Sequence, residues 1–156
     1  INAQLHFVPP KNFNLTAKTQ YTYHTTIDVT DPNDSYYGDQ IPYIPWHSGS
    51  AVGMFGWQND WQQYGLNYSF IYVGERYNQQ ENIIYNYTQP WYTHDLSLFG
   101  EWQFGTKNKE SRIKTKRPIS LRVALDVNNL LSQDYDVILN YPMPKRNYKC
   151  TISITY

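Results

Sequence analysis

The chain has few cysteines and no excess of either charge. Its 156 residues include one cysteine, Cys150, and 13 basic residues balance 13 acidic ones. A single cysteine excludes an internal disulfide framework and any zinc site built from several cysteines. The zero net charge gives no general reason to expect nucleic-acid binding. We therefore expect neither a disulfide-stabilised scaffold nor a nucleic-acid partner.

Long apolar runs are also missing, and mean hydropathy is negative. The uncharged apolar runs fall far short of the ~18 residues that a transmembrane helix needs. No targeting signal is visible, because the chain starts at Ile1 without a methionine, a charged segment or an apolar segment. We expect the chain to be a fragment or a processed product.

Aromatic residues, in contrast, are abundant. The chain contains 16 tyrosines and 5 tryptophans. A small core cannot bury so many rings and also satisfy each hydroxyl and indole N–H. Many of these rings must therefore lie at an interface, on a binding surface or in membrane girdles.

The last ten residues alternate completely between apolar and polar side chains. One face of the expected strand carries Tyr148, Cys150, Ile152, Ile154 and Tyr156. A water-soluble sandwich also makes such strands, so the alternation alone does not identify the solvent. A terminal tyrosine suits a membrane interface, where the ring is buried and the hydroxyl stays wet.

Similar alternation predicts an all-β, antiparallel fold. We expect seven strands, at about residues 2–8, 13–29, 50–58, 64–72, 94–105, 119–128 and 147–156.

The connections between these strands alternate in character. The second, fourth and sixth are long and rich in aromatic residues, whereas the others are tighter and polar. The segment 106–118, which holds six of the 13 basic residues, is longer than a usual turn. Alternate connections of an antiparallel sheet lie at opposite ends, so the pattern predicts a transmembrane β-barrel with short periplasmic turns and long outer loops. An odd number of strands predicts further strands upstream, because single-chain bacterial barrels have even numbers.

Several segments resemble one family, the TonB-dependent outer-membrane receptors. Asp126 to Tyr135, followed by Asn140 to Tyr148 and a terminal aromatic residue, is similar to the closing segment of that family. Ile41 to His47 and Tyr72 to Tyr77 also resemble family segments. Two departures are a lysine, Lys145, where the family usually has glycine, and a terminal tyrosine in place of the commoner phenylalanine.

This resemblance implies a barrel of about 22 strands with a plugged lumen, of which residues 1–156 form the last third. The plug domain and the amino-terminal strands are absent from the sequence. Such receptors lie in the bacterial outer membrane and import a scarce, bulky nutrient such as a siderophore, haem or cobalamin. The implied partners are outer-membrane lipid, TonB through the plug, and the nutrient, and a surface lipoprotein remains an open question. No cofactor and no enzymatic activity are implied.

The candidate ligand contacts are seven aromatic residues of the long loops. The alternative is that these rings have a structural role, either packing the loops against one another or forming the outer aromatic girdle at the membrane surface. The residues are Tyr36, Tyr37, Tyr43, Trp46, Tyr85, Tyr87 and Trp91.

A second candidate site is the last strand, which would carry the signal read by the barrel-insertion machinery. Its residues are Tyr148, Ile152, Ile154 and Tyr156. The four histidines show no metal-binding spacing, and we expect them to be hydrogen-bonded lumen or loop residues.

Two other readings fit parts of the pattern. A soluble carbohydrate-binding β-sandwich would bind through the aromatic loops but leaves the odd strand count unexplained. An outer-membrane enzyme would need a nucleophile paired with a base, and no such pair can be identified from spacing, so no catalytic residue is predicted.

Overall fold

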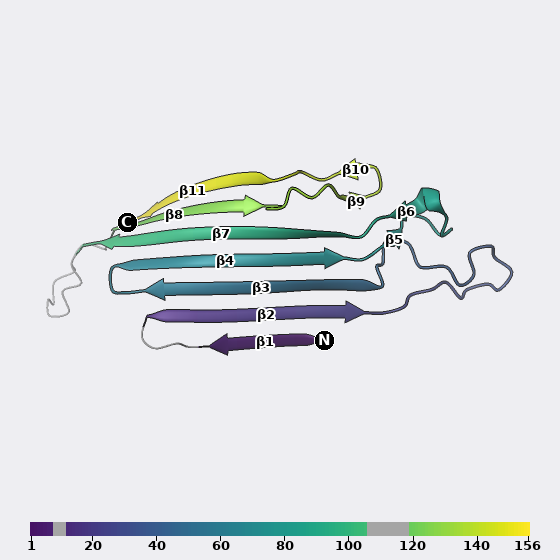
Figure 1. Ribbon diagram of the computed structural model, residues 1–156, viewed down its shortest axis with the longest axis horizontal. Helices are drawn as coiled ribbons and strands as arrows, with labels where there is room; N and C mark the ends of the chain where they lie inside the picture. The colour runs from purple at the N-terminus through teal and green to yellow at the C-terminus, as the bar shows by residue number, and fades with distance from the viewer. Residues whose placement is uncertain (8–11, 106–118) are drawn as a thin grey trace.

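One antiparallel sheet dominates the computed structural model, which describes residues 1–7, 12–105 and 119–156. The sheet follows chain order from one edge to the other (Figure 1). This confirms the predicted all-β, antiparallel fold. Its seven strands are β1 (Asn2–Phe7), β2 (Phe13–Tyr23), β3 (His47–Gln58), β4 (Gln62–Val73), β7 (Trp91–Phe104), β8 (Ile119–Asn128) and β11 (Asn147–Thr155).

Short elements occupy the long loops at one end of the sheet (Figure 1). In the second long loop, residues 74–90, β5 (Arg76–Tyr77) pairs with β6 (Tyr87–Thr88) after the 3₁₀ turn η1 (Ile84–Asn86). In the third long loop, residues 129–146, β9 (Asp136–Ile138) pairs with β10 (Tyr141–Pro142).

The tight turn 59–61 lies at the opposite end, which we call the turn end (Figure 1). There the Asn59 side chain accepts hydrogen bonds from the backbone N–H groups of Trp61 and Gln62, at 2.9 and 2.7 Å. Asparagine favours turns because its side chain can bond the backbone in this way. The basic segment 106–118 lies outside the described residues.

The second strand was predicted to reach Val29, but β2 ends at Tyr23. The register explains this, because β3 begins at His47, directly opposite Tyr23. The chain then enters the first long loop, residues 24–46, and pairs with itself. Asp28 N–H donates to the Asp39 carbonyl at 2.8 Å, and Ile27 bridges Gln40. The alternation beyond Tyr23 therefore belongs to a local hairpin inside the loop.

The two faces of the sheet differ in chemistry, as strand alternation predicts. The apolar face carries one cross-strand row of Phe7, Leu15, Phe55, Leu66, Leu98, Leu125 and Cys150.

The adjacent row, on the polar face, is His6, Thr16, Met54, Asn67, Ser97, Asp126 and Lys149.

Several charged side chains on the polar face have partners there. Arg122 lies 3.6 Å from Glu101 and stacks over the Phe99 ring at 4.0 Å. Ser97 Oγ donates to Asp126 Oδ1 at 2.5 Å. The polar face thus has the character expected of a barrel lumen.

Aromatic rings border the apolar face at both ends. At the loop end Tyr21, Tyr72 and Tyr92 align in register, and at the turn end Trp57 pairs with Tyr64. Eight residues separate Tyr64 from Tyr72, which is about 27 Å along a strand. A strand tilted by about 40° spans roughly 20 Å of membrane over that length, close to the apolar band of outer-membrane barrels. The spacing of the rings therefore matches a bilayer.

Polar atoms on the apolar face are matched with partners on the same face. Tyr21 and His47 form a hydrogen bond between the hydroxyl and Nδ1 at 2.7 Å, and Tyr68 and His94 do so at 2.6 Å. His94 pairs with Phe70 across the strands, which places it on the apolar face. The prediction that the histidines are lumen or loop residues is therefore wrong for His47 and His94.

Across the described parts of the chain, no apolar side chain is buried. A two-layer sandwich would cover the apolar face with a second sheet, but the seven long strands form one sheet. The soluble sandwich alternative is therefore not the fold. Over the same residues, no helix is long and apolar enough to cross a membrane.

Candidate functional site

The three long loops contact one another above the end of the sheet. Tyr43 N–H donates to the Tyr77 carbonyl at 2.8 Å, and Asn82 N–H donates to Asp39 Oδ2 at 3.0 Å. Gln40, only 5% exposed, donates to the Ile44 carbonyl at 2.7 Å and to the Glu75 carbonyl of the second long loop at 3.4 Å. These bonds join the first and second long loops into one layer.

Arg76 joins the second long loop to the third. Its guanidinium Nη2 donates to the carbonyls of Asp136 and Val137 at 3.2 and 2.6 Å, and the residue is 5% exposed. Burial lowers the pKa of Arg76, because a charged guanidinium loses solvation there. Carbonyl oxygens offset part of this cost.

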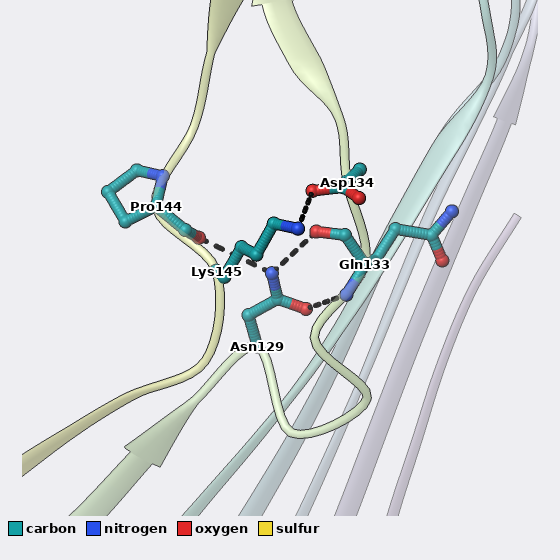
Figure 2. A network of polar contacts seen from close by, with 5 residues as sticks. All are labelled: Asn129, Gln133, Asp134, Pro144 and Lys145. Atoms are coloured by element: carbon teal, nitrogen blue, oxygen red, sulfur yellow. Dashed lines mark hydrogen bonds and ion pairs between the residues drawn. The ribbon is translucent and has the colours of Figure 1, made fainter.

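Asn129 organises the turn that follows β8 (Figure 2). Its side-chain Nδ2 donates to the carbonyls of Gln133 and Pro144 at 2.8 and 3.3 Å, while its Oδ1 accepts from Gln133 N–H at 2.9 Å. Its backbone N–H donates to Asp95 Oδ1 at 2.8 Å. The residue is 3% exposed and adopts a φ of 51°, a left-handed conformation that asparagine tolerates better than most residues. One side chain thus ties both ends of the third long loop together.

Lys145 occupies the position where the family resemblance predicts glycine. It pairs with Asp134 at 3.0 Å, with both side chains largely exposed (Figure 2). The described non-glycine residues with positive φ do not include Lys145, so the backbone here does not need glycine. The substitution is compatible with the loop.

A cavity of about 240 Å³ lies on the polar face, where β7, β8 and the third long loop meet. Trp91 and Tyr135 stack at its wall with ring centroids 4.6 Å apart. Asn128 Nδ2 donates to Asn147 Oδ1 at 2.8 Å. We call this cavity the lumenal pocket, and its lining is Ile71, Trp91, Thr93, Asp95, Asn128, Asn129, Tyr135, Pro144 and Asn147.

The lumenal pocket combines aromatic surface with polar groups. Trp91 Nε1 is buried and has no hydrogen-bond partner among the described residues. Burial raises the pKa of Tyr135, and the nearby charge of Asp95 raises it further. Asp95 adds a carboxylate to the lining. An apolar surface with a few polar groups is the usual composition of a small-molecule site.

The seven predicted aromatic residues do not form one cluster. In this set of fully described residues, no two of the seven rings stack on each other. Tyr37, Tyr43 and Tyr85 are 46%, 52% and 84% exposed. Trp91 lies in β7 rather than in a loop, and Tyr87 lies in β6.

Tyr36, Trp46 and Tyr87 are partly covered. Tyr87 meets Tyr77 edge to face with centroids 5.7 Å apart and donates from its hydroxyl to Glu75 Oε2 at 3.0 Å. Trp46 Nε1 is buried and unpaired within the described chain. These three rings contribute to the loop layer.

Sequence reasoning missed the partners of Trp91 in the lumenal pocket. Tyr135 lies in the segment that resembles the closing segment of the family. Its ring contacts Trp91, a residue far away in the chain, and the spacing of residues in the sequence cannot reveal such a contact. Asn128 and Asn147 flank the third long loop, and the pairing of β8 with β11 brings them together. A register prediction for those two strands could have found this pair.

The predicted assembly residues Tyr148, Ile152, Ile154 and Tyr156 are 71%, 66%, 66% and 86% exposed. The first three lie in β11, at the edge of the sheet. Among the described residues, no group of three histidine, cysteine, aspartate or glutamate side chains could hold a metal ion.

Comparison with known protein families gives a match to the first five-sixths of the chain. A family model described as "TonB dependent receptor-like, beta-barrel" matches residues 1–130. No curated protein matches the chain. The matched region runs from β1 through β8 and includes the first two long loops.

Proposed function

The chain belongs to the TonB-dependent receptor β-barrel family, and from this premise we propose that it forms the last third of a plugged receptor barrel of about 22 strands that imports a scarce, bulky nutrient. The family consists of bacterial outer-membrane transporters rather than enzymes. The nutrient classes that we propose are siderophores, haem and cobalamins.

The lumenal pocket is the observation that carries this proposal. It lies on the polar face beneath the third long loop, where a ligand that enters from outside would meet the barrel wall. The Trp91 and Tyr135 rings, tilted by 31° with centroids 4.6 Å apart, offer aromatic surface to a planar or conjugated ligand. The Asp95 carboxylate adds a polar group to the same lining.

The exposed loop rings extend this surface outward. Tyr37, Tyr43 and Tyr85 combine large contact area with few rotatable bonds, so they bind at low entropic cost. We assign the first capture of the ligand to these rings and its closer binding to the lumenal pocket. Tyr36, Trp46 and Tyr87 hold the loops in place for this capture.

Energy for import would come from TonB through a plug that belongs to a preceding part of the receptor. The apolar face would contact outer-membrane lipid, and the carboxy-terminal strand would carry the assembly signal.

The test uses the whole receptor in cells that lack other uptake systems. Growth is measured with ferric enterobactin, haemin or cyanocobalamin as the limiting nutrient, and binding of the active compound is then measured on purified receptor. We expect one of them to support growth and Trp91→Ala to weaken its binding about tenfold or more, as at other aromatic hot spots.

A matched control is Trp61→Ala, because Trp61 is 46% exposed in the tight turn at the opposite end of the sheet. It should leave binding unchanged. Growth on none of the three compounds would reject the nutrient classes. Equal effects of the two substitutions would reject the lumenal pocket as the binding site.

A further inference from the structure

A second cavity opens on the apolar face, away from the lumenal pocket. It has a volume of about 510 Å³ and includes Tyr64, Leu66, Leu98, Gly100, Trp102 and Val123 in its lining. We call it the lipid-side groove. All six residues belong to β4, β7 and β8, so the groove crosses three adjacent strands.

Gly100 lies beneath the turn-side rim of the groove. In the register of the sheet it stands between Tyr64 and Val123. The Trp102 and Tyr64 rings lean over it, because a Cβ added at Gly100 would lie 2.8 Å from Trp102 and 3.3 Å from Tyr64. The two rings therefore cover Gly100, which is buried, and they form an aromatic rim on the turn side of the groove.

The rim is held rigid by its own polar atoms. Trp102 Nε1 donates to the Tyr64 hydroxyl at 3.0 Å, and that hydroxyl donates to Gln62 Oε1 at 3.4 Å. The two rings meet edge to face with centroids 5.8 Å apart. The polar atoms of both rings are therefore bonded to each other and to Gln62, so the rings present hydrocarbon surface to the groove.

The position of the groove identifies its occupant. The apolar face of this family lies against the bilayer, so the groove is continuous with the lipid-contacting surface. Tyr64 and Trp102 belong to the aromatic border at the turn end, and short turns of outer-membrane barrels face the periplasm. The groove therefore opens into the periplasmic half of the bilayer.

We propose that the lipid-side groove is a residence site for one acyl chain of a glycerophospholipid from the periplasmic leaflet. A chain seated there contacts the aromatic rim and the side chains of Leu66, Leu98 and Val123, whereas a chain on the flat face contacts the protein on one side only. The added dispersion contacts hold the lipid longer than its neighbours. This inference depends on the membrane position of the barrel and not on the imported nutrient.

The test labels the lipid contacts of the receptor in its membrane. The receptor is reconstituted into phosphatidylethanolamine vesicles that contain a small fraction of the same lipid with a diazirine on its acyl chain. After irradiation, mass spectrometry of peptides locates the attached lipid. We expect attachment to concentrate at residues 64–66 and 98–102.

Gly100→Leu displaces the Trp102 and Tyr64 rings that cover this position, so it removes the aromatic rim and should reduce this attachment severalfold. The matched control is Gly53→Leu, because Gly53 has no atom within 4 Å of an added Cβ and shares the apolar face with Tyr68, its partner across the strands. Val123→Phe fills the same groove from β8 and gives the same result if Gly100→Leu disturbs folding. Heat-modifiable migration on gels shows which variants are folded.

Two results would overturn the proposal. Attachment spread evenly over the apolar face, or unchanged in folded Gly100→Leu and Val123→Phe receptors, would mean that no residence site exists. Attachment at residues 98–102 in vesicles but not in native membranes treated with the same probe would mean that another protein covers the groove there.

Discussion

An arginine placed at the middle of the apolar face should destabilise the barrel strongly, and Leu98→Arg is the sharpest such change. Leu98 lies six residues from Tyr92 at one aromatic border and four from Trp102 at the other, about 20 and 14 Å along the strand. It is 49% exposed and therefore faces the surrounding medium. An arginine near the bilayer midplane costs about 2–4 kcal/mol in outer-membrane barrels. The folding equilibrium should thus fall by roughly 30- to 1000-fold.

The measurement is equilibrium folding of the receptor into phospholipid vesicles across a guanidinium titration, followed by tryptophan fluorescence. Ser97→Arg is the matched control, because Ser97 is adjacent in β7 but lies on the polar face, beside Asp126. Tyr92→Arg tests depth, since the cost near an interface falls to about 0–1 kcal/mol. Leu98→Arg should be the most costly of the three.

Equal costs at Leu98 and Ser97 would refute the assignment of the two faces. A cost for Tyr92→Arg as large as that for Leu98→Arg would keep the faces but reject the proposed depth of the aromatic borders. Either outcome would also remove the basis for the lipid-side groove.

Three further predictions concern the loops and the last strand. Asn129→Gly keeps the left-handed backbone but removes three side-chain hydrogen bonds. Proteolysis of the third long loop should become faster, and the free energy of unfolding should fall by about 1–3 kcal/mol. Lys145→Ala loses only an exposed ion pair and should lower the free energy of unfolding by less than about 1 kcal/mol. Tyr156→Ala should lower the amount of receptor assembled in the outer membrane, as scored by heat-modifiable migration, and Tyr156→Phe should not; equal yields would remove Tyr156 from the assembly signal. Burial and the hydrogen bond to Glu75 raise the pKa of Tyr87, so its stabilising contribution is present below the ordinary tyrosine pKa and is lost as pH rises through the raised value. Ultraviolet titration of Tyr87→Phe should lose a late-ionising tyrosine, and loss of an early one would contradict this.

The seven long strands could be predicted because side-chain alternation is a local property of the sequence. The ends of the strands were predicted less accurately, because a strand continues only as far as a neighbouring strand pairs with it. Trp91 shows this well. The alternation was read from His94, yet Trp91 is held in β7 by its pairing with Val73 on β4.

The geometry of the site could be predicted only in part. The segment around Asn129 was recognisable as a motif, but its bonds to Asp95 and Pro144 join residues far apart in the chain. His47 and His94 were placed wrongly, because each is a polar residue on the apolar face whose hydrogen-bond partner the sequence pattern does not show. For His94 that partner is the Tyr68 hydroxyl, which pattern analysis cannot supply.

The absence of a buried apolar side chain from the described sheet changes how the chain should tolerate substitution. In a water-soluble core, a shortened side chain leaves an empty volume that neighbouring atoms cannot fill, and each lost methylene is costly. On the apolar face, mobile hydrocarbon tails flow into any such space. Leucine, isoleucine and valine should therefore replace one another at Leu66, Leu98 or Leu125 in a combinatorial library with little change in stability. Side-chain shape should be selected only at positions such as Gly100, where the rings of Tyr64 and Trp102 fix the surface.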